Sequence, residues 1–394
     1  MKRLGCRCCW SRLCCSPAGY GGHSVRPTAA AAPNSPVGPK LVLLAPAAHA
    51  GSESDIKERT RAVKIQLTSA ILAFVLLAAP LDAETQQGAK IARIGLVTTI
   101  SAEHPQRELS DAFRRGLREL GYVEGQNIVI EYRSAQGRAE RLPELFAELA
   151  RRKVDLILVV GGTPMARAAK QANIKIPVIA PAMGDPVGDG VVASLAHPGG
   201  NITGSTFLGP ALVPKRIELL KEAIPGVARV AALWHPGAYG DRTMTEMSKE
   251  TEAAGQKLGV QLQLLEARSA SDFGQAFSAM MRERARALVV LPSPMFYGEH
   301  QRIVDLALTN RLPAIFAFRE AADAGALMSY GANLSDLFRR GAIQADKILR
   351  GAKPDDLPVE QPTKFEFIIN LKTAKTLGLT IPKSLLLRAD QVLE

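Results

Sequence analysis

From residue 91 to the end of the chain, short apolar runs alternate with segments whose apolar residues recur every three or four positions. The runs are typical of strands buried on both faces, and the second spacing is typical of helices that cover them. The expected strands are 91–100, 127–133, 154–160, 176–183, 228–234, 260–267, 287–292, 312–318 and one within 364–379. The expected helices are 103–120, 139–151, 164–172, 211–224, 241–258, 271–284, 298–310, 333–350 and a short one within 364–379. This alternation predicts parallel sheets with helices on both faces.

The alternation falls into two successive blocks of about 110 residues each. We interpret 201–207 as a segment that crosses between the blocks and 325–331 as a segment that returns. The fold class is therefore α/β, with two doubly wound parallel-sheet lobes. The first lobe is expected to hold 91–205 and about 325–350, and the second 206–324 and about 351–394.

Residues 57–83 have the three parts of a secretory signal peptide. Basic residues at 57–64 precede the apolar run 67–79, and Leu81-Asp82-Ala83 offers a cleavage site. The run is shorter than the ~18–20 residues that a bilayer demands, so we expect export to the periplasm, with an uncleaved anchor as the alternative. Residues 1–56 hold all five cysteines and show no periodicity. We interpret them as a disordered extension or as a misassigned start, with translation beginning near Val63.

Charge and motif content exclude several classes of function. The net charge is +11, but residues 1–83 hold 10 basic and 4 acidic side chains, so the remainder is only mildly basic and no nucleic-acid partner is expected. Common hydrolase, metalloprotease and P-loop motifs are absent, and one G-x-G-x-x-A match at 188–193 is poorly placed for a dinucleotide. The four histidines after residue 83 are scattered. We expect no catalytic residue, metal or cofactor.

Polar and aromatic residues follow the expected strands where those strands end. In doubly wound sheets, ligands bind beyond the carboxyl ends of the strands. Thr163 and Ser293 each precede a proline, which predicts a hydroxyl at the helix N-cap and proline at the first helical position. Such helix starts bind carboxylates or phosphates, although ordinary capping remains the simpler interpretation. Gly162, just before Thr163, lets the backbone approach a ligand.

Other strand-end side chains have two interpretations each. Asp185 could bind an ammonium or hydroxyl group, or begin a turn. Trp234 and Tyr330 could pack on a ligand or in the core, and Arg319 could pair with an acid or face solvent. The candidate ligand-binding residues are Thr98, Thr99, Ser101, Gly162, Thr163, Asp185, Trp234, Ser293, Arg319 and Tyr330.

Four stretches carry a resemblance to a known family. They are GGTPMARAAK (161–170), IPVIAPAMGDPVGDGVVASLAHPGGNITG (176–204), GALMSYGANLSDLFRRGA (325–342) and KILRGAKPDDLPVEQPTKFEFIINLKTAKTLGLTIP (347–382). Together they resemble the substrate-binding proteins of ABC transporters, in the group of tryptophan/tyrosine-type periplasmic proteins with the type I periplasmic-binding fold. The resemblance implies ligand contacts from Thr163 and Asp185 in the first lobe, with Thr98, Thr99 and Ser101 nearby, from Trp234 and Ser293 in the second, and Tyr330 near a crossing.

These observations predict the extracytoplasmic solute-binding component of an ABC importer. It is expected to be a monomer that binds a small amino-acid-like solute between its lobes and delivers it to a membrane permease. Two other classes stay open, a cytosolic ligand-responsive regulator with the same fold and an α/β enzyme acting on sugar nucleotides. Periplasmic release favours the receptor, whereas turnover of a nucleotide sugar that is lost in Asp185→Ala favours the enzyme.

Overall fold

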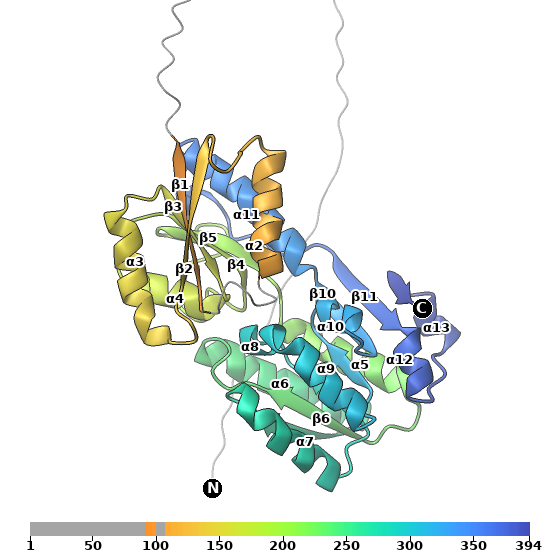
Figure 1. The fold of residues 1–394 in the computed structure, drawn as a ribbon. Coiled ribbons are helices and arrows are strands. Elements are labelled where there is room, and N and C mark those ends of the chain that lie inside the picture. The colour runs from red at the N-terminus through yellow and green to blue at the C-terminus, as the bar shows by residue number, and fades with distance from the viewer. Residues whose placement is uncertain (1–90, 100–106) are drawn as a thin grey trace, which may run out of the picture. The chain divides into compact units, whose positions relative to one another are not determined.

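The computed structural model describes residues 91–99 and 107–394, and its first sheet contains five parallel strands (Figure 1). The strand order is β2-β1-β3-β4-β5. The strands are β1 (Ala92–Thr98), β2 (Ile128–Ser134), β3 (Leu156–Val160), β4 (Val178–Met183) and β5 (Ile202–Thr206). The helices packed with them are α2 (Arg107–Glu119), α3 (Leu142–Arg151), α4 (Thr163–Gln171) and α11 (Leu334–Leu349). We call these elements the first lobe; α11 arrives from far along the chain and lies against α2 and β4.

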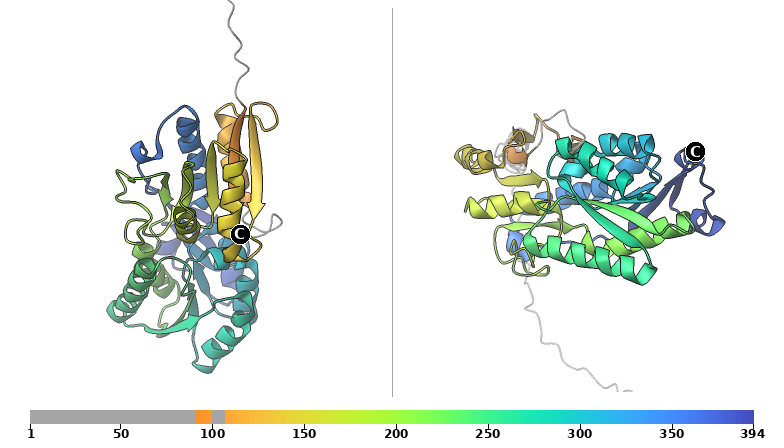
Figure 2. Two further views of the ribbon diagram at one scale, coloured as in Figure 1. Left: turned by 90° about the vertical axis from the view of Figure 1, so that its left-hand side faces the viewer. Right: turned by 90° about the horizontal axis from the view of Figure 1, so that it is seen from below.

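The second sheet has seven strands in the order β12-β11-β10-β9-β8-β6-β7. They are β6 (Arg229–Trp234), β7 (Gln261–Glu266), β8 (Ala287–Val290), β9 (Ala314–Phe316), β10 (Met328–Ala332), β11 (Phe365–Asn370) and β12 (Gln391–Leu393). Its helices are α5 (Val213–Ala223), α6 (Asp241–Leu258), α7 (Phe273–Arg282), α8 (Pro294–Gly298), α9 (His300–Thr309), α10 (Arg319–Asp323), α12 (Leu371–Thr376) and α13 (Lys383–Leu386). Short 3₁₀ turns are η1 (Ala139–Arg141), η2 (Pro210–Leu212), η3 (Ala270–Asp272) and η4 (Pro354–Asp356). We call these strands and helices the second lobe (Figure 2).

The two sheets repeat one topology. The order β7-β6-β8-β9-β10 in the second sheet corresponds strand by strand to β2-β1-β3-β4-β5 in the first. In the first sheet the chain adds β2 on one side of β1 and β3 on the other, so the strand order reverses between β1 and β3. In the second sheet it reverses in the same way between β6 and β8. Ligands of doubly wound sheets bind beyond the carboxyl ends of the strands at that point. Each lobe therefore offers one binding edge, near Val160 in the first lobe and near Val290 in the second.

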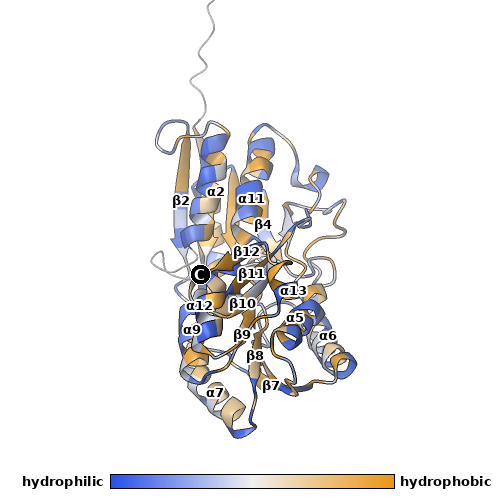
Figure 3. Ribbon diagram, turned by 90° about the vertical axis from the view of Figure 1, so that its right-hand side faces the viewer, coloured by the Kyte–Doolittle hydropathy of each residue, from blue (hydrophilic) through white to orange (hydrophobic). Residues whose placement is uncertain are grey.

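The central strands are apolar throughout because helices cover both of their faces. All five residues of β3 are buried, as are all four of β8. Figure 3 shows the apolar strands of the second sheet between α5 and α6 on one side and α9 on the other. Burial of each aliphatic side chain contributes roughly 1.5–3 kcal/mol, so these strands supply much of the stability of each lobe. One apolar cluster also contains side chains from both lobes, among them Phe113 and Val289.

The chain passes between the lobes three times. It leaves the first lobe after β5, returns between β10 and α11, and leaves again between α11 and β11. The third passage pairs with the end of β5: the Glu360 N–H donates to the Gly204 carbonyl at 2.9 Å, and the Thr206 N–H donates to the Glu360 carbonyl at 2.8 Å. The first and third passages are therefore hydrogen-bonded to each other and are not independent linkers.

Several predictions about individual segments were wrong. Segment 201–207 contains β5, a strand of the first sheet, and 325–331 overlaps β10, a strand of the second sheet, so only the α11 part of 325–350 packs on the first sheet. The second sheet is mixed, because β11 runs antiparallel to β10. The expected helix 298–310 is found as α9, with the separate short helix α8 before it, and neither α13 nor β12 was expected. Short strands rich in Gly, Ser and Thr lack the apolar run that marks a buried strand.

Within residues 91–99 and 107–394, no helix combines the length and the apolar content needed to cross a bilayer. In the same part of the chain, no three His, Cys, Asp or Glu side chains gather as a metal ion would require. The predicted extension 1–56 and the predicted signal peptide 57–83 lie outside the described residues.

Candidate functional site

A pocket lies between the binding edges of the two lobes. We call it the cleft pocket. Its first-lobe wall comes from α2, the start of α4, the end of β4 and α11, and its second-lobe wall from the ends of the facing strands and from α8. The lining residues are Leu109, Gly161, Gly162, Pro181, Ala182, Leu334 and Phe338 from the first lobe, and Tyr239, Ser293, Pro294, Tyr297 and Phe318 from the second, with Phe207 from the first crossing.

Aromatic rings form a continuous wall on one side of the cleft pocket. The Phe207 ring centroid lies 5.5 Å from that of Tyr239 and 5.7 Å from that of Phe318, which in turn lies 5.9 Å edge-on from Tyr297. Burial raises the pKa of Tyr239 and of Tyr297 far above the usual phenol range, so both hydroxyls stay neutral donors. Such a wall can pack against a flat apolar group, with rings that prefer tilted or edge-on contact.

The first-lobe wall brings backbone to the pocket at Gly162. Its φ of +66° belongs to the region that favours glycine. A Cβ at this position would lie 3.0 Å from the Ala182 carbonyl oxygen and 3.7 Å from the Tyr239 ring. The Gly162 backbone therefore lies between a strand of the first lobe and a ring of the second. Gly162 is also the N-cap of α4, whose first N–H groups have no partner within the helix. The site therefore offers backbone donors to an anionic group.

The two predicted hydroxyl caps have different outcomes. Ser293 is the N-cap of α8, and its Oγ accepts from the N–H groups of Met295 at 3.2 Å and Phe296 at 3.5 Å. Thr163 is not a cap: Gly162 is the N-cap, and Thr163 is the first residue of the helix. The Thr163 hydroxyl is fully buried and accepts from the Gly184 N–H at 2.8 Å, which fixes the loop after β4.

That loop, residues 184–189, bonds to the opposite lobe. Asp185 begins a turn, because its Oδ1 accepts from the Gly188 N–H at 2.8 Å, and its own N–H donates to the Thr243 hydroxyl at 3.0 Å. The Asp189 carboxylate accepts from the N–H of Gly240 at 3.1 Å, from the N–H of Thr243 at 3.2 Å and from the Thr243 hydroxyl at 2.7 Å. Asp189 thus caps the start of α6 from the other lobe, and its charge suits a helix N-terminus. We call these contacts the latch.

The other predicted site residues lie outside the cleft pocket. Thr98 is buried at the end of β1, and the neighbouring Thr99 accepts from the Gly137 N–H through its carbonyl. Trp234 packs against the core, and the Tyr330 ring lies among Phe365 and Phe367. Arg319 pairs with Asp323 at 3.2 Å and with Glu366 at 3.6 Å, toward the edge of the second sheet. Ser101 lies outside the described residues. The structure thus brings Gly162 and Ser293 together and places Thr163 and Asp185 beside them.

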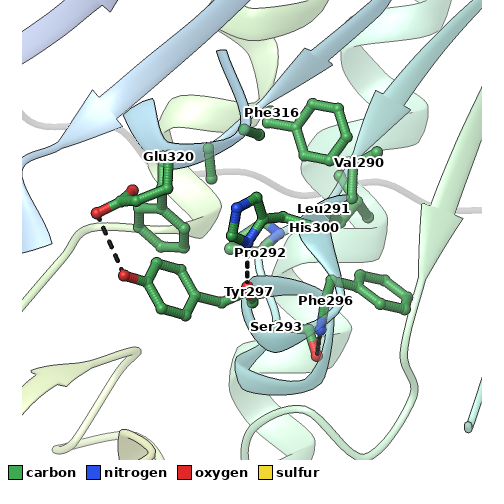
Figure 4. A pocket seen from close by; sticks show the side chains of 12 residues that line it. Val290, Leu291, Pro292, Ser293, Phe296, Tyr297, His300, Phe316 and Glu320 are labelled. Carbon is green, nitrogen blue, oxygen red and sulfur yellow. Dashed lines mark hydrogen bonds between the residues drawn. The ribbon is translucent and has the colours of Figure 1, made fainter. Parts of the chain in front are cut away.

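A second pocket adjoins the first within the second lobe (Figure 4). It shares Ser293, Tyr297 and Phe318 with the cleft pocket. We call it the acid pocket, because Glu320 lies in its wall; the remaining lining residues are Val290, Leu291, Pro292, Phe296, His300, Phe316, Ala317 and Ala321. The Tyr297 hydroxyl donates to Glu320 Oε1 at 3.2 Å. Burial raises the pKa of Glu320 to about 7.

Sequence reasoning missed the residues that build most of the two pockets. Phe318 and Glu320 flank the predicted Arg319 after a strand, so the strand-end rule selected the turn that lines the two pockets but not the side chains that line them. Tyr297 follows the predicted cap Ser293 by one helical turn. No sequence signal marked Tyr239 or Phe207, whose roles depend on how the lobes meet.

Comparison with known proteins gives concordant matches. The model of the family described as ABC transporter substrate binding protein matches residues 94–393. A curated Tyrosine-binding protein of Clostridioides difficile is 27% identical over 283 residues, which are 70% of this chain and 79% of that protein. A solved domain from Streptococcus pneumonia in complex with L-Trp is 27% identical, with a TM-score of 0.69 over 77% of this chain and 99% of that one. The ligand-free, open structure of a substrate binding protein with adhesive properties from Clostridium difficile is 25% identical, with a TM-score of 0.57 over 77% and 99%.

Proposed function

Because this chain belongs to the ABC transporter substrate-binding protein family, we propose that it is an extracytoplasmic receptor for a small amino-acid-like solute with an aromatic side chain. It binds the solute between its two lobes, without catalysis, and delivers it to a membrane permease. It acts as a monomer and has no nucleic-acid partner. The names of its relatives, a Tyrosine-binding protein and a domain solved with L-Trp, support the solute class.

The aromatic wall of the cleft pocket is the observation that carries this proposal. Phe207, Tyr239, Tyr297 and Phe318 present ring faces and edges to the cleft pocket, where they can pack against one aromatic side chain. Opposite the wall, the N-terminal N–H groups of α4 at Gly162 are positioned to bind the carboxylate of such a solute. The Ser293 hydroxyl uses its lone pairs as a cap and keeps its proton for a ligand oxygen.

The latch supports closure of the lobes over the solute. Its hydrogen bonds join a first-lobe loop to a second-lobe helix, so they form only when the lobes are together. The higher TM-score with the L-Trp complex than with the open, ligand-free structure agrees with a closed arrangement. Of the candidate residues, we retain Gly162, Thr163 and Ser293 as ligand-site residues, and we assign Asp185 to the contact between lobes.

Isothermal titration calorimetry with a panel of solutes tests the solute class. L-Tryptophan or L-tyrosine is expected to bind at least about 100-fold more tightly than L-alanine, because burial of an aromatic ring contributes roughly 3–4 kcal/mol. Branched amino acids and simple sugars serve as the comparison ligands. Tight binding of a sugar, or failure of every amino acid, would overturn the amino-acid part of the proposal.

Cell fractionation tests the proposed location. The mature protein is expected in the periplasmic fraction, beginning near Glu84, after removal of residues 57–83. A variant with Phe74→Asp and Leu76→Asp interrupts the apolar run and is expected to remain in the cell as the longer precursor. Intact-mass measurement distinguishes the two forms. Recovery of the wild-type chain from the cytosol with residues 57–83 still attached contradicts the proposed export.

A further inference from the structure

Glu320 brings an incompletely bonded carboxylate into the acid pocket. One oxygen, Oε1, accepts from the Tyr297 hydroxyl at 3.2 Å, and the other, Oε2, is buried and has no hydrogen-bond partner. Figure 4 shows the Glu320 and Tyr297 side chains meeting at one side of the pocket, with His300 beside them. A buried acceptor without a partner is costly, and more so when it is charged. Such a group in a pocket calls for a donor that arrives with the ligand.

The charged groups around Glu320 do not supply that donor. Glu108 approaches from α2 of the first lobe and Asp323 lies on the same short helix, and both disfavour a second negative charge. The neighbouring Arg319 is engaged by Asp323 and Glu366. His300 on α9 holds the Tyr297 carbonyl oxygen at 2.7 Å from its Nδ1. The acid pocket therefore has excess negative potential that faces the first lobe across the cleft.

We propose that Glu320 receives the ammonium group of the bound solute, with Tyr297 holding its other carboxylate oxygen. This inference rests on the proposed function and names the chemical group that the second lobe recognises. A primary ammonium has three donors, one of which satisfies Oε2. The rings of Tyr297 and Phe318 also lie at the boundary between the two pockets, where a cation gains from their faces. The ammonium group enters the acid pocket, while the carboxylate and the aromatic side chain stay in the cleft pocket.

The protonation state of Glu320 gives this contact a pH dependence. With its pKa raised to about 7 in the free protein, the carboxyl is mostly protonated at pH 6 and mostly ionised at pH 8. An ammonium binds the ionised form, so affinity is expected to rise about tenfold from pH 6 to pH 8. The titratable and charged groups facing Glu320 are Tyr297, His300, Asp323, Arg319 and Glu108. Since His300 also lines the pocket, His300→Asn is the control for the pH profile.

Calorimetry with matched ligands tests the inference. The probes are L-tryptophan, tryptamine, which lacks the carboxylate, and indole-3-propionate, which lacks the amine. The wild type is expected to prefer L-tryptophan over indole-3-propionate by at least about 50-fold, and Glu320→Gln is expected to reduce this preference to below about fivefold and to flatten the pH profile. Asp305→Asn, on α9 and exposed, is expected to change neither. Tyr297→Phe, which removes only the hydroxyl, is expected to weaken L-tryptophan binding about three- to tenfold.

The possible outcomes separate the two proposals. If the wild type binds L-tryptophan but Glu320→Gln keeps the full preference for the amine, the inference fails and the proposed function stands. Equal affinity of the wild type for L-tryptophan and indole-3-propionate would also overturn the inference and leave the proposed function standing. If the wild type binds neither L-tryptophan nor L-tyrosine, the proposed solute class fails and the inference fails with it. Thermal unfolding of each variant confirms that a loss of binding is not a loss of folding.

Discussion

Replacing Asp189 with alanine is expected to weaken solute binding by about 10- to 100-fold, although Asp189 lines neither pocket. The carboxylate accepts three hydrogen bonds from the start of α6, and all three join the first lobe to the second. Hydrogen bonds to a charged acceptor contribute about 1.5–3 kcal/mol, and here they stabilise only the closed arrangement. Apparent affinity falls with the population of the binding-competent state, so a weaker latch means weaker binding.

The matched control is Asp241→Ala. Asp241 is an exposed acid in the first turn of the same helix, so the substitution makes the same change in charge without breaking the latch. Calorimetry with the tightest ligand of the panel measures the affinity, and small-angle scattering measures the separation of the lobes. Asp189→Ala is expected to be more open than the wild type without ligand. If its affinity stays within about twofold of the wild type, the latch does not stabilise the closed state.

Replacing Arg216 with alanine is expected to lower the free energy of unfolding by about 3–5 kcal/mol. The side chain is fully buried. Its Nε donates to the Tyr330 carbonyl at 2.8 Å, and its Nη1 donates to the Gly209 carbonyl at 3.4 Å. Its Nη2 has no hydrogen-bond partner. Burial lowers the pKa of Arg216 to about 10, so the group is still cationic at neutral pH. Alanine leaves a cavity and removes the donor from both carbonyls, which lie beside the first and second crossings between the lobes.

Two further variants separate charge from volume at this position. Arg216→Met keeps most of the volume and removes the buried charge, so its loss of stability is expected to stay below about 2 kcal/mol. Lys215→Ala removes the neighbouring half-buried charge and its pair with Glu218, and is expected to change stability by less than about 0.5 kcal/mol. Urea unfolding monitored by circular dichroism measures all three variants. An alanine variant within about 1 kcal/mol of the wild type contradicts the bridging role of Arg216.

The long and strongly patterned elements could be predicted from the sequence. Strands such as 154–160 and helices such as 241–258 carry continuous apolar runs or a clear helical period, and their signals are local. β5 and β10 were interpreted as crossings because ITGST and MSYGA contain small and polar residues. They are strands because a neighbouring strand supplies hydrogen bonds and burial to them, a contribution that no single segment contains.

The candidate site shows the same division. The strand ends selected from the sequence include Gly162 and Ser293, which line the cleft pocket. Within that edge the choice of side chain was less certain: Arg319 points toward Glu366, whereas the adjacent Glu320 lines the acid pocket. Which of two neighbours faces a cavity depends on the rotation of a short helix, and that rotation is set by packing rather than by the residues themselves.

By itself, the sequence determined the two α/β lobes, two of the strand-end residues that line the cleft pocket and the family to which the chain belongs, because hydrophobic periods, turn residues and local motifs lie in consecutive positions. The tertiary structure alone decided which groups meet. Asp189 reaches Thr243 across 54 residues, and Arg216 reaches Tyr330 across 114. Such contacts are selected by the packing of whole lobes, whose free energy is shared among many side chains and is not assigned to any one segment of the chain.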